Sequence, residues 1–310
     1  MREARLTRRR TGSRDHRQLT IMPELLLLTS LPTIPDGDTA ELVAPAFRAR
    51  GWRVHCRCID ALRLDAAGPV IVDRAAPVRP AAMDMIWVLG FGRREGFLDK
   101  MQLLQTLSPQ VRFVNRIEAL LTLHGKYPAA ATDDRLPQPL TFAAADPDFL
   151  IDCGRAEGGR WVLKPPGGSF GRDVHLLDAE SPDFAPTIHR LAANGWWLLQ
   201  RYCPEVEAGE HRVLVASGRI IGSYRREPTI GPSNLAGGGR ATRAGADPER
   251  DRLARSAAAF LLARGIAWAG LDLAGPWVLE ANIINPGGLD TLRQLGAGNL
   301  APDVVSALLE

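Results

Sequence analysis

The chain lacks several features that define common classes of protein. It has 310 residues, but no apolar run approaches the roughly 20 residues that a membrane-spanning helix needs. Its four cysteines, Cys56, Cys58, Cys153 and Cys203, include no CxxC pair. We therefore interpret them as reduced thiols rather than disulfides or metal ligands. These absences predict a cytoplasmic protein with no membrane partner.

Outside the N-terminal segment, the chain has no excess of basic over acidic side chains. The formal net charge is +3, but residues 1–21 contain seven arginines against Glu3 and Asp15, a net of +5. The rest of the chain has 31 basic and 33 acidic side chains, a net of −2. A folded body with this balance has no general attraction for a polyanion, so we expect no nucleic-acid partner.

Residues 1–21 also lack apolar periodicity, and we predict a disordered basic tail. Arg8-Arg9-Arg10 is similar to a twin-arginine export signal, but the apolar stretch Leu25–Leu28 is too short for the hydrophobic region of such a signal. A nucleic-acid arm, a targeting segment and a start of translation at Met22 remain as alternatives. The third is favoured because a predicted strand follows Met22 almost at once.

The two common nucleotide motifs, GxGxxG and GxxxxGK[ST], are missing as well. What the chain has instead is a strand at Leu25–Thr29, a helix that Asp38 or Thr39 can cap, and a strand at Arg53–Ile59. This βαβ order predicts an N-terminal α/β domain over residues 22–122.

A glycine-containing loop, Gly90–Gly96, follows another apolar strand of this domain. Ligands of open α/β sheets gather at the carboxyl ends of strands, so Arg93 and Arg94 are candidates for gripping an anionic substrate. Solvated loop arginines are an equally good interpretation. A helix that ends near Lys126 should close the domain.

The stretch from Trp161 to Leu177 predicts a phosphate-binding hairpin. Lys164 lies near the end of an apolar strand, and Gly167, Gly168, Ser169 and Gly171 follow it. Glycine-rich turns let backbone N–H groups surround phosphate oxygens. Alone the pattern is weak, because most such turns are only turns.

Two further stretches carry polar residues at strand ends. The backbone from Arg201 to Cys203, after Gln200, can pair with an adenine edge, with Tyr202 in its middle. Glu205, Glu207 and Glu210 are nearby and can each hold a ribose. Arg212 and Arg226 begin and end a predicted antiparallel pair. The loop Asn234–Arg240 contains three consecutive glycines, which are costly to order, so we expect it to face a ligand.

The C-terminal hairpin Ala269–Asn282 carries the most specific chemistry. Glu280 and Asn282 are two apart and share one face of a strand, and hairpin pairing brings Asp272 beside them. Two carboxylates and an amide oxygen suit Mg²⁺. The alternative is an ordinary edge hairpin with polar residues in water.

Taken together, these motifs resemble those of ATP-grasp enzymes, most closely the prokaryotic glutathione synthetases. The resemblance covers about Pro23 to Glu310 and is strongest at Val162–Pro165, Gln200–Arg212, Asn234–Arg240 and the C-terminal hairpin. It implies an ATP-grasp α/β fold, with an N-terminal α/β (pre-ATP-grasp) domain, a glycine-rich lid subdomain at 123–198 and a C-terminal α+β subdomain at 199–310.

The resemblance also implies roles for the matching residues and a pair of cofactors, ATP and Mg²⁺ (or Mn²⁺). ATP binding falls to Lys126, Lys164, Gly167, Gly168, Ser169, Gly171, Gln200, Arg201, Tyr202 and Glu210; catalysis to Arg212, Arg226 and Arg240; substrate binding to Arg93, Asn234, Gly238 and Gly239; and the metal to Asp272, Glu280 and Asn282.

The implied reaction is ATP-dependent joining of a small-molecule carboxylate and an amine through an acylphosphate, in a homodimer or homotetramer. γ-Glutamylcysteine and glycine are the first substrates to consider. An ATP-grasp phosphotransferase and a non-catalytic nucleotide-binding protein are the alternatives. The chain departs from the family at Gly90–Gly96, in its short lid loop and at Asn285–Leu289, all on the side where substrates rather than ATP would lie.

Overall fold

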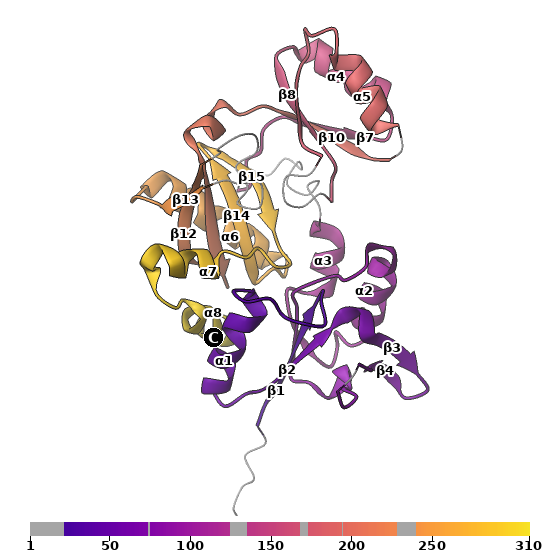
Figure 1. Ribbon diagram of the computed structural model, residues 1–310, viewed down its shortest axis with the longest axis vertical. Coiled ribbons are helices and arrows are strands. Elements are labelled where there is room, and N and C mark those ends of the chain that lie inside the picture. The colour runs from indigo at the N-terminus through magenta and orange to yellow at the C-terminus, as the bar shows by residue number, and fades with distance from the viewer. Residues whose placement is uncertain (1–21, 74, 125–134, 168–172, 194, 228–239) are drawn as a thin grey trace, which may run out of the picture.

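The computed structural model describes residues 22–73, 75–124, 135–167, 173–193, 195–227 and 240–310. In this part of the chain, three sheets of four or five strands are arranged along the long axis of the molecule (Figure 1). A separate two-stranded hairpin, β3 (Leu62–Asp65) and β4 (Gly68–Ile71), projects from the first of them. None of the helices in the described ranges has the length and apolarity needed to cross a membrane.

The first sheet is parallel and has the strand order β2-β1-β5-β6. Its strands are β1 (Glu24–Thr29), β2 (Arg53–Cys58), β5 (Met85–Val88) and β6 (Arg112–Val114). Its helices are α1 (Thr39–Ala49), α2 (Phe97–Gln105) and α3 (Ile117–Leu123). The Asp38 carboxylate accepts a hydrogen bond from the Ala40 N–H and caps α1. The predicted βαβ opening is confirmed, with Ile59 just beyond its second strand.

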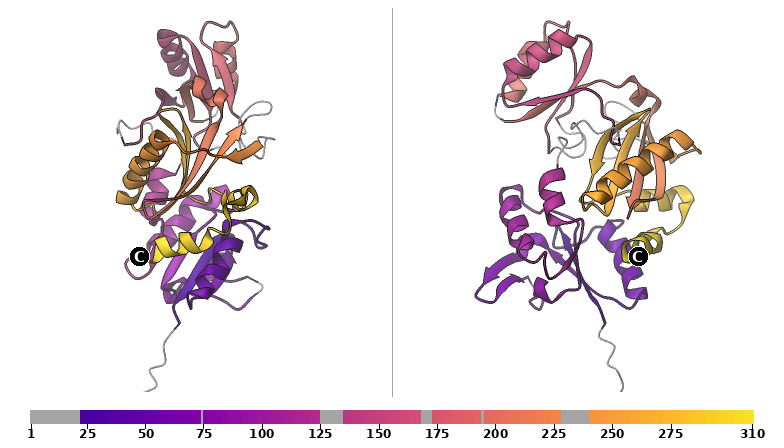
Figure 2. Two further views of the ribbon diagram at one scale, coloured as in Figure 1. Left: turned by 90° about the vertical axis from the view of Figure 1, so that its left-hand side faces the viewer. Right: turned by 180° about the vertical axis from the view of Figure 1, so that it is seen from behind.

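The second sheet, β7-β10-β8-β9, is antiparallel and is covered by two helices. It comprises β7 (Thr141–Ala144), β8 (Arg160–Lys164), β9 (His175–Asp178) and β10 (Trp197–Arg201), with α4 (Pro147–Glu157) and α5 (Phe184–Ala192). We call this unit the lid. It has its own apolar core and lies at one end of the molecule (Figure 2). The predicted boundary between residues 198 and 199 falls inside β10, which pairs with β7 and β8 and so belongs to the lid.

The third sheet, β13-β12-β11-β14-β15, is antiparallel. It comprises β11 (Glu210–Ala216), β12 (Arg219–Glu227), β13 (Arg240–Arg243), β14 (Trp268–Ala274) and β15 (Trp277–Asn282), with α6 (Pro248–Ala263), α7 (Leu289–Leu292) and α8 (Ala301–Leu309) nearby. The predicted C-terminal hairpin is confirmed as β14 and β15.

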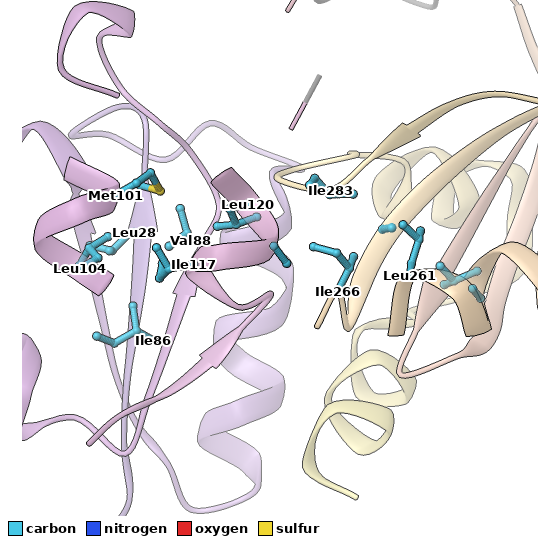
Figure 3. Close-up of a cluster of buried hydrophobic side chains, with 14 of the residues drawn as sticks. Leu28, Ile86, Val88, Met101, Leu104, Ile117, Leu120, Leu261, Ile266 and Ile283 are labelled. Atoms are coloured by element: carbon cyan, nitrogen blue, oxygen red, sulfur yellow. The ribbon is translucent and has the colours of Figure 1, made fainter. Parts of the chain in front are cut away.

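The first and third sheets share two apolar cores. Side chains alternate along β1, so that Leu26 and Leu28 join one core while Leu25 and Leu27 join the other. Both faces are buried, which explains the uninterrupted leucine run. In the first core, Leu120 of α3 and Ile283 after β15 approach each other across the boundary between the two parts (Figure 3). The N-terminal domain and the third sheet are therefore held together by apolar packing.

Asn115 provides the polar link between these two parts. Its buried side chain donates to the carbonyls of Trp268 (2.7 Å) and Ile283 (2.6 Å), and its oxygen accepts from the N–H groups of Ala267 (2.7 Å) and Trp268 (2.8 Å). The residue has a φ of +59°, a left-handed conformation that asparagine tolerates better than most residues. One side chain at the end of β6 thus satisfies three backbone groups at the start of β14 and one directly after β15.

We predict that Asn115→Ala lowers the free energy of unfolding by about 3 kcal/mol or more, because it leaves several buried backbone groups without partners. Urea unfolding followed by circular dichroism measures the loss. Asn115→Gly, which removes the same bonds but relieves the φ constraint, should be nearly as unstable. Thr122→Ala, at an exposed helix position, should change stability by no more than about 0.5 kcal/mol. A small effect of both Asn115 variants would contradict the linking role.

Candidate active site

The centre of the third sheet holds a buried ion pair between two paired strands. Arg212 of β11 is the register partner of Asp272 of β14. Its Nε and Nη2 donate to the two Asp272 oxygens, at 2.5 and 2.9 Å, in a two-pronged arrangement that fixes the direction of the guanidinium. Its Nη1 donates to the carbonyl of Pro286, beyond β15.

A second arginine reaches the same carboxylate. Nη2 of Arg226, from β12, lies 2.8 Å from an Asp272 oxygen and also contacts the Glu210 carboxylate at the start of β11. Arg226 is 7% exposed, and its Nε is buried with no hydrogen-bond partner among the described residues. A buried donor of this kind favours an anionic ligand, because leaving it unpaired is costly.

The charges of this cluster set its protonation. Burial alone would raise the pKa of Asp272, but Arg212 and Arg226 outweigh it, and the pKa is lowered. Burial would likewise lower the pKa of Arg212, but Asp272 holds it above its ordinary value. Desolvation raises the pKa of the Tyr224 hydroxyl against the opposing effect of the two arginines. At neutral pH the cluster therefore holds two guanidinium ions and an ionised aspartate.

Glu280 and Asn282 lie on the same side of the hairpin as Asp272, but closer to open space. Glu280 is the register partner of Asp272, and the Asn282 amide donates to an Asp272 oxygen at 3.2 Å. Glu280 and Asn282 line a cavity of about 790 Å³, whereas Asp272 is only 4% exposed. The three predicted metal ligands are therefore neighbours, with Asp272 buried behind Glu280 and Asn282.

Two of these three side chains face the cavity and offer oxygen ligands that suit Mg²⁺. Glu280 offers a carboxylate and Asn282 an amide oxygen, both hard ligands. Both Asp272 oxygens already accept hydrogen bonds, so the role that the structure shows for Asp272 is to hold Arg212 and Arg226. No cluster of three histidine, cysteine or acidic side chains with metal-binding geometry occurs in the described ranges. The assignment of the metal to the trio stays a prediction.

Lys164 lies at the end of β8, in the lid. It is 8% exposed, and its Nζ donates to the Gln200 side-chain oxygen of the neighbouring β10 at 2.7 Å. Gln200 in turn donates to the Thr141 hydroxyl at 2.9 Å. Burial raises the pKa of the adjacent Cys203 thiol to about 11, and Lys164 partly opposes the shift. The lysine and the glutamine predicted to bind ATP are thus in direct contact.

The side chains of Arg201 and Tyr202 have structural partners. The Arg201 guanidinium lies 4.1 Å from the centre of the Trp161 ring and donates to the Gly158 carbonyl. The Tyr202 hydroxyl donates to Glu207 at 2.8 Å. Their backbone N–H groups are also paired, with the carbonyls of Leu140 (2.7 Å) and Arg160 (3.0 Å). The role of this stretch in adenine binding stays a prediction.

The cavity lies where the first sheet meets the C-terminal hairpin. Gly167 and Arg94 line it, but Arg93 does not. The Arg93 N–H donates to both Asp60 oxygens, at 3.1 and 3.0 Å. Arg94 is therefore the better candidate of the two loop arginines.

Several predicted residues lie outside the described ranges, namely Lys126, Gly168, Ser169, Gly171, Asn234, Gly238 and Gly239. Arg240 begins β13 opposite Glu227 and is exposed. It lies apart from the cluster around Asp272, which reaches only to β12.

The sequence marked Asn285–Leu289 only as a departure from the family, and the role of this segment in supporting Arg212 was missed. The Thr39 hydroxyl donates to the Asn285 side-chain oxygen at 2.6 Å, and the Asn285 amide donates to the Asp38 carboxylate at 2.8 Å. The next residue, Pro286, supplies the carbonyl that accepts from Arg212. The only signal was Asn285-Pro286-Gly287-Gly288 itself, an unusual turn directly after the predicted metal strand.

The sequence is similar to those of known proteins. The family described as prokaryotic glutathione synthetase, ATP-grasp domain, matches residues 138–297. A glutathione synthetase from Parasynechococcus marenigrum (strain WH8102) is 31% identical over 314 residues, which span 93% of this chain and 99% of that protein.

Solved structures share the fold at lower identity. D-cycloserine synthetase DcsG superposes with a TM-score of 0.68 at 18% identity, covering 92% of this chain and 99% of that one. A RimK domain ATP-grasp protein from Sphaerobacter thermophilus gives 0.66 at 20% identity, covering 93% and 100%. The predicted ATP-grasp fold is confirmed, and the chain belongs to the prokaryotic glutathione synthetase family of ATP-grasp ligases.

Proposed function

We propose that the protein is an ATP-dependent carboxylate–amine ligase that works through an acylphosphate. The observation that carries the proposal is the Arg212–Asp272–Arg226 cluster, directly behind Glu280 and Asn282 at the cavity wall. Phosphoryl transfer needs positioning and charge neutralisation more than it needs a protein nucleophile. The two buried guanidinium groups hold Asp272, which in turn holds Asn282 at the cavity wall and so contributes to positioning.

In this reaction a carboxylate oxygen of the acid attacks the γ-phosphorus of ATP, and ADP leaves. The nitrogen of the amine then attacks the acyl carbon, phosphate leaves with the bonding electrons, and the amine releases a proton to solvent. Arg226, with its unpaired buried Nε, is suited to hold the phosphoryl group as charge moves onto it. Mg²⁺, held by Glu280 and Asn282, would add positive charge at the phosphates.

Lys164 and the lid would hold the nucleotide. The ammonium group of Lys164 can reach a phosphate by exchanging its bond to Gln200, and both residues are buried enough to exclude water from the contact. Arg94 of the N-terminal domain donates to the carbonyl of Gly167 in the lid. This contact joins the two walls of the cavity and favours protection of an acylphosphate from water.

We predict that the purified protein releases ADP and phosphate in a Mg²⁺-dependent manner only when an acid and an amine are both present. A coupled assay should start with γ-glutamylcysteine and glycine and continue through other pairs. Transfer to a hydroxyl acceptor would instead give a phosphorylated product and no free phosphate. ADP formation without phosphate release would therefore replace the ligase with a phosphotransferase.

Glu280→Gln and Asp272→Asn should separate ligand binding from structural support. Both are isosteric. We expect Glu280→Gln to lower turnover by at least about 100-fold while the thermal midpoint stays close to wild type, because Glu280 faces the cavity. Turnover close to that of wild type in this variant would remove Glu280 from the metal site.

Asp272→Asn should lower the free energy of unfolding by about 3–5 kcal/mol at pH 7, because two buried arginines lose their shared counter-ion. The pKa of Asp272 is lowered in the folded protein, so its contribution is complete above the pKa of the unfolded chain, about 4, and is lost as the pH falls below it. The difference between wild type and variant should therefore narrow in acid. Urea unfolding at several pH values measures it, and a constant difference would contradict the ion-pair account.

A further inference from the structure

Part of the cavity wall comes from the segment that leads into α1. Asp38 lines the cavity together with Glu280, Asn282 and Asn285 of the C-terminal segment. In the proposed reaction Glu280 holds Mg²⁺, whereas Asp38 has no part in it. A carboxylate in the wall of a substrate cavity is suited to bind a positively charged group of a substrate, because hydrogen bonds between two charged groups are stronger than those between neutral ones.

The Asp38 carboxylate is held in one orientation. Its Oδ1 accepts a hydrogen bond from the Ala40 N–H at 2.8 Å, and its Oδ2 accepts one from the Asn285 side-chain amide at 2.8 Å. The preceding residue, Gly37, has a φ of +75° and packs so closely on Asp290 that a Cβ there would lie 2.9 Å from the Asp290 carboxyl carbon. The carboxylate is therefore in place before a ligand arrives, which lowers the entropy cost of binding.

The two donors that fix this carboxylate are both neutral. An ionised carboxylate has about four acceptor positions on its two oxygens, and the Ala40 N–H and the Asn285 amide each use one of them. The other buried carboxylate of the site, Asp272, differs because two guanidinium groups bind it. The hydrogen bonds of Asp38 thus set its position, and acceptor positions remain for a cationic ligand.

The contact with Asn285 places Asp38 beside the proposed reaction centre. Asn285 is followed by Pro286, whose carbonyl accepts from Arg212. It also lies three residues after Asn282, and three residues span at most about 11 Å. Asp38 and Asn282 line the same cavity, so one small substrate can contact both.

We propose that Asp38 binds a primary ammonium group of a substrate in this cavity. The inference rests on the proposed ligase function, which supplies an amine and an acid as ligands. The ammonium group has two sources, the amine that joins the acyl group and an amino group carried by the acid. Both present the same chemistry, a nitrogen cation with three N–H donors.

Two pairs of probes, each differing in the ammonium group, test the proposal and separate the two sources. Glycine is compared with glycolate, which has a hydroxyl in its place, and γ-glutamylcysteine with N-glutarylcysteine, which has a hydrogen there. Ligand-observed NMR measures the dissociation constants with Mg²⁺ and a non-hydrolysable ATP analogue present. We expect the ammonium-bearing member of at least one pair to bind at least about 10-fold more tightly than its partner. No preference in either pair would overturn the proposal.

Asp38→Asn removes the charge while the local contacts can be kept. Asparagine caps a helix as well as aspartate does, and the Asn285 side chain can flip to accept from the new amide and donate to Thr39. We expect the preference for ammonium to fall to about 3-fold or less, with the thermal midpoint close to wild type. The pair that loses its preference identifies the source.

A preference that persists in Asp38→Asn, or equal weakening of all four probes, would overturn the proposal. Asp36→Asn is the matched control, because Asp36 lies in the same loop but is exposed and outside the cavity wall. It should leave all four affinities unchanged. If Asp38→Asn does not fold, Asp38→Ser, which keeps a capping hydroxyl, replaces it with the same expectation.

The double variant Asp38→Asn with Asn285→Asp returns a carboxylate to the same wall. The amide at position 38 then donates to the carboxylate at position 285, which still accepts from Thr39, so both hydrogen bonds are kept with one direction reversed. We expect the preference for ammonium to recover to within about 3-fold of wild type. No recovery in a folded double variant would show that charge is not the cause and would overturn the proposal.

The binding assay and the turnover assay fail independently. A preference for ammonium that depends on Asp38, without ADP release from any acid–amine pair, would reject the ligase and keep the ammonium site. ADP release with γ-glutamylcysteine and glycine, with KM values that Asp38→Asn does not change, would keep the ligase and reject the ammonium site.

Discussion

The buried pairing of two arginines with Asp272 is the constraint around which the site is built. Charges removed from water are tolerated only with close partners, and this cluster supplies them from three adjacent strands, β12, β11 and β14. The order of these strands places Arg226 and Arg212 on the same side of the carboxylate. Because Arg212 also bonds to the Pro286 carbonyl, the cluster fixes the path of the chain after β15. The C-terminal segment and the chemistry thus depend on one set of contacts.

That path then determines how the first sheet meets the third. Asn285 follows β15 and exchanges hydrogen bonds with Asp38 and Thr39 at the start of α1. Asn115 makes the second polar connection, and apolar side chains from both sheets fill the space between them. The cavity lies at this junction, so most of its wall comes from the two parts that these contacts join, and Pro166 and Gly167 add a contribution from the lid. The lid has a core of its own and contacts the loop at Arg94.

Much of this arrangement could be predicted from the sequence because it follows from local rules. The leucine run of β1, the Asp38 cap and the hairpin Ala269–Asn282 can each be recognised from a short stretch of sequence. The proximity of Asp272, Glu280 and Asn282 followed from strand alternation and hairpin pairing alone. The fold as a whole came from the joint order of several motifs, none of which was specific by itself.

The sequence could not show which partner each polar side chain binds. Asp272, Glu280 and Asn282 look equivalent on a hairpin, yet Asp272 is enclosed by arginines while the other two reach the cavity. Arg93 and Arg94 look interchangeable, and only Arg94 faces the cavity, because the Arg93 backbone is held by Asp60. Each choice depends on a neighbour 33 or 60 positions away in the chain.

The same reasoning explains why the family resemblance does not identify the substrate. In the proposed reaction, residues that hold charge at the reaction centre must suit phosphoryl transfer whatever acid is used, so they do not identify the acid. The rings of Phe91, Phe97 and His124, which also line the cavity, carry no such requirement. Phe91 and His124 come from a loop and a helix end that no catalytic rule constrains, and their contact arises only when α3 packs beside the Gly90–Gly96 loop. A pocket assembled in this way is free to change its ligand while the arginine–aspartate cluster stays the same.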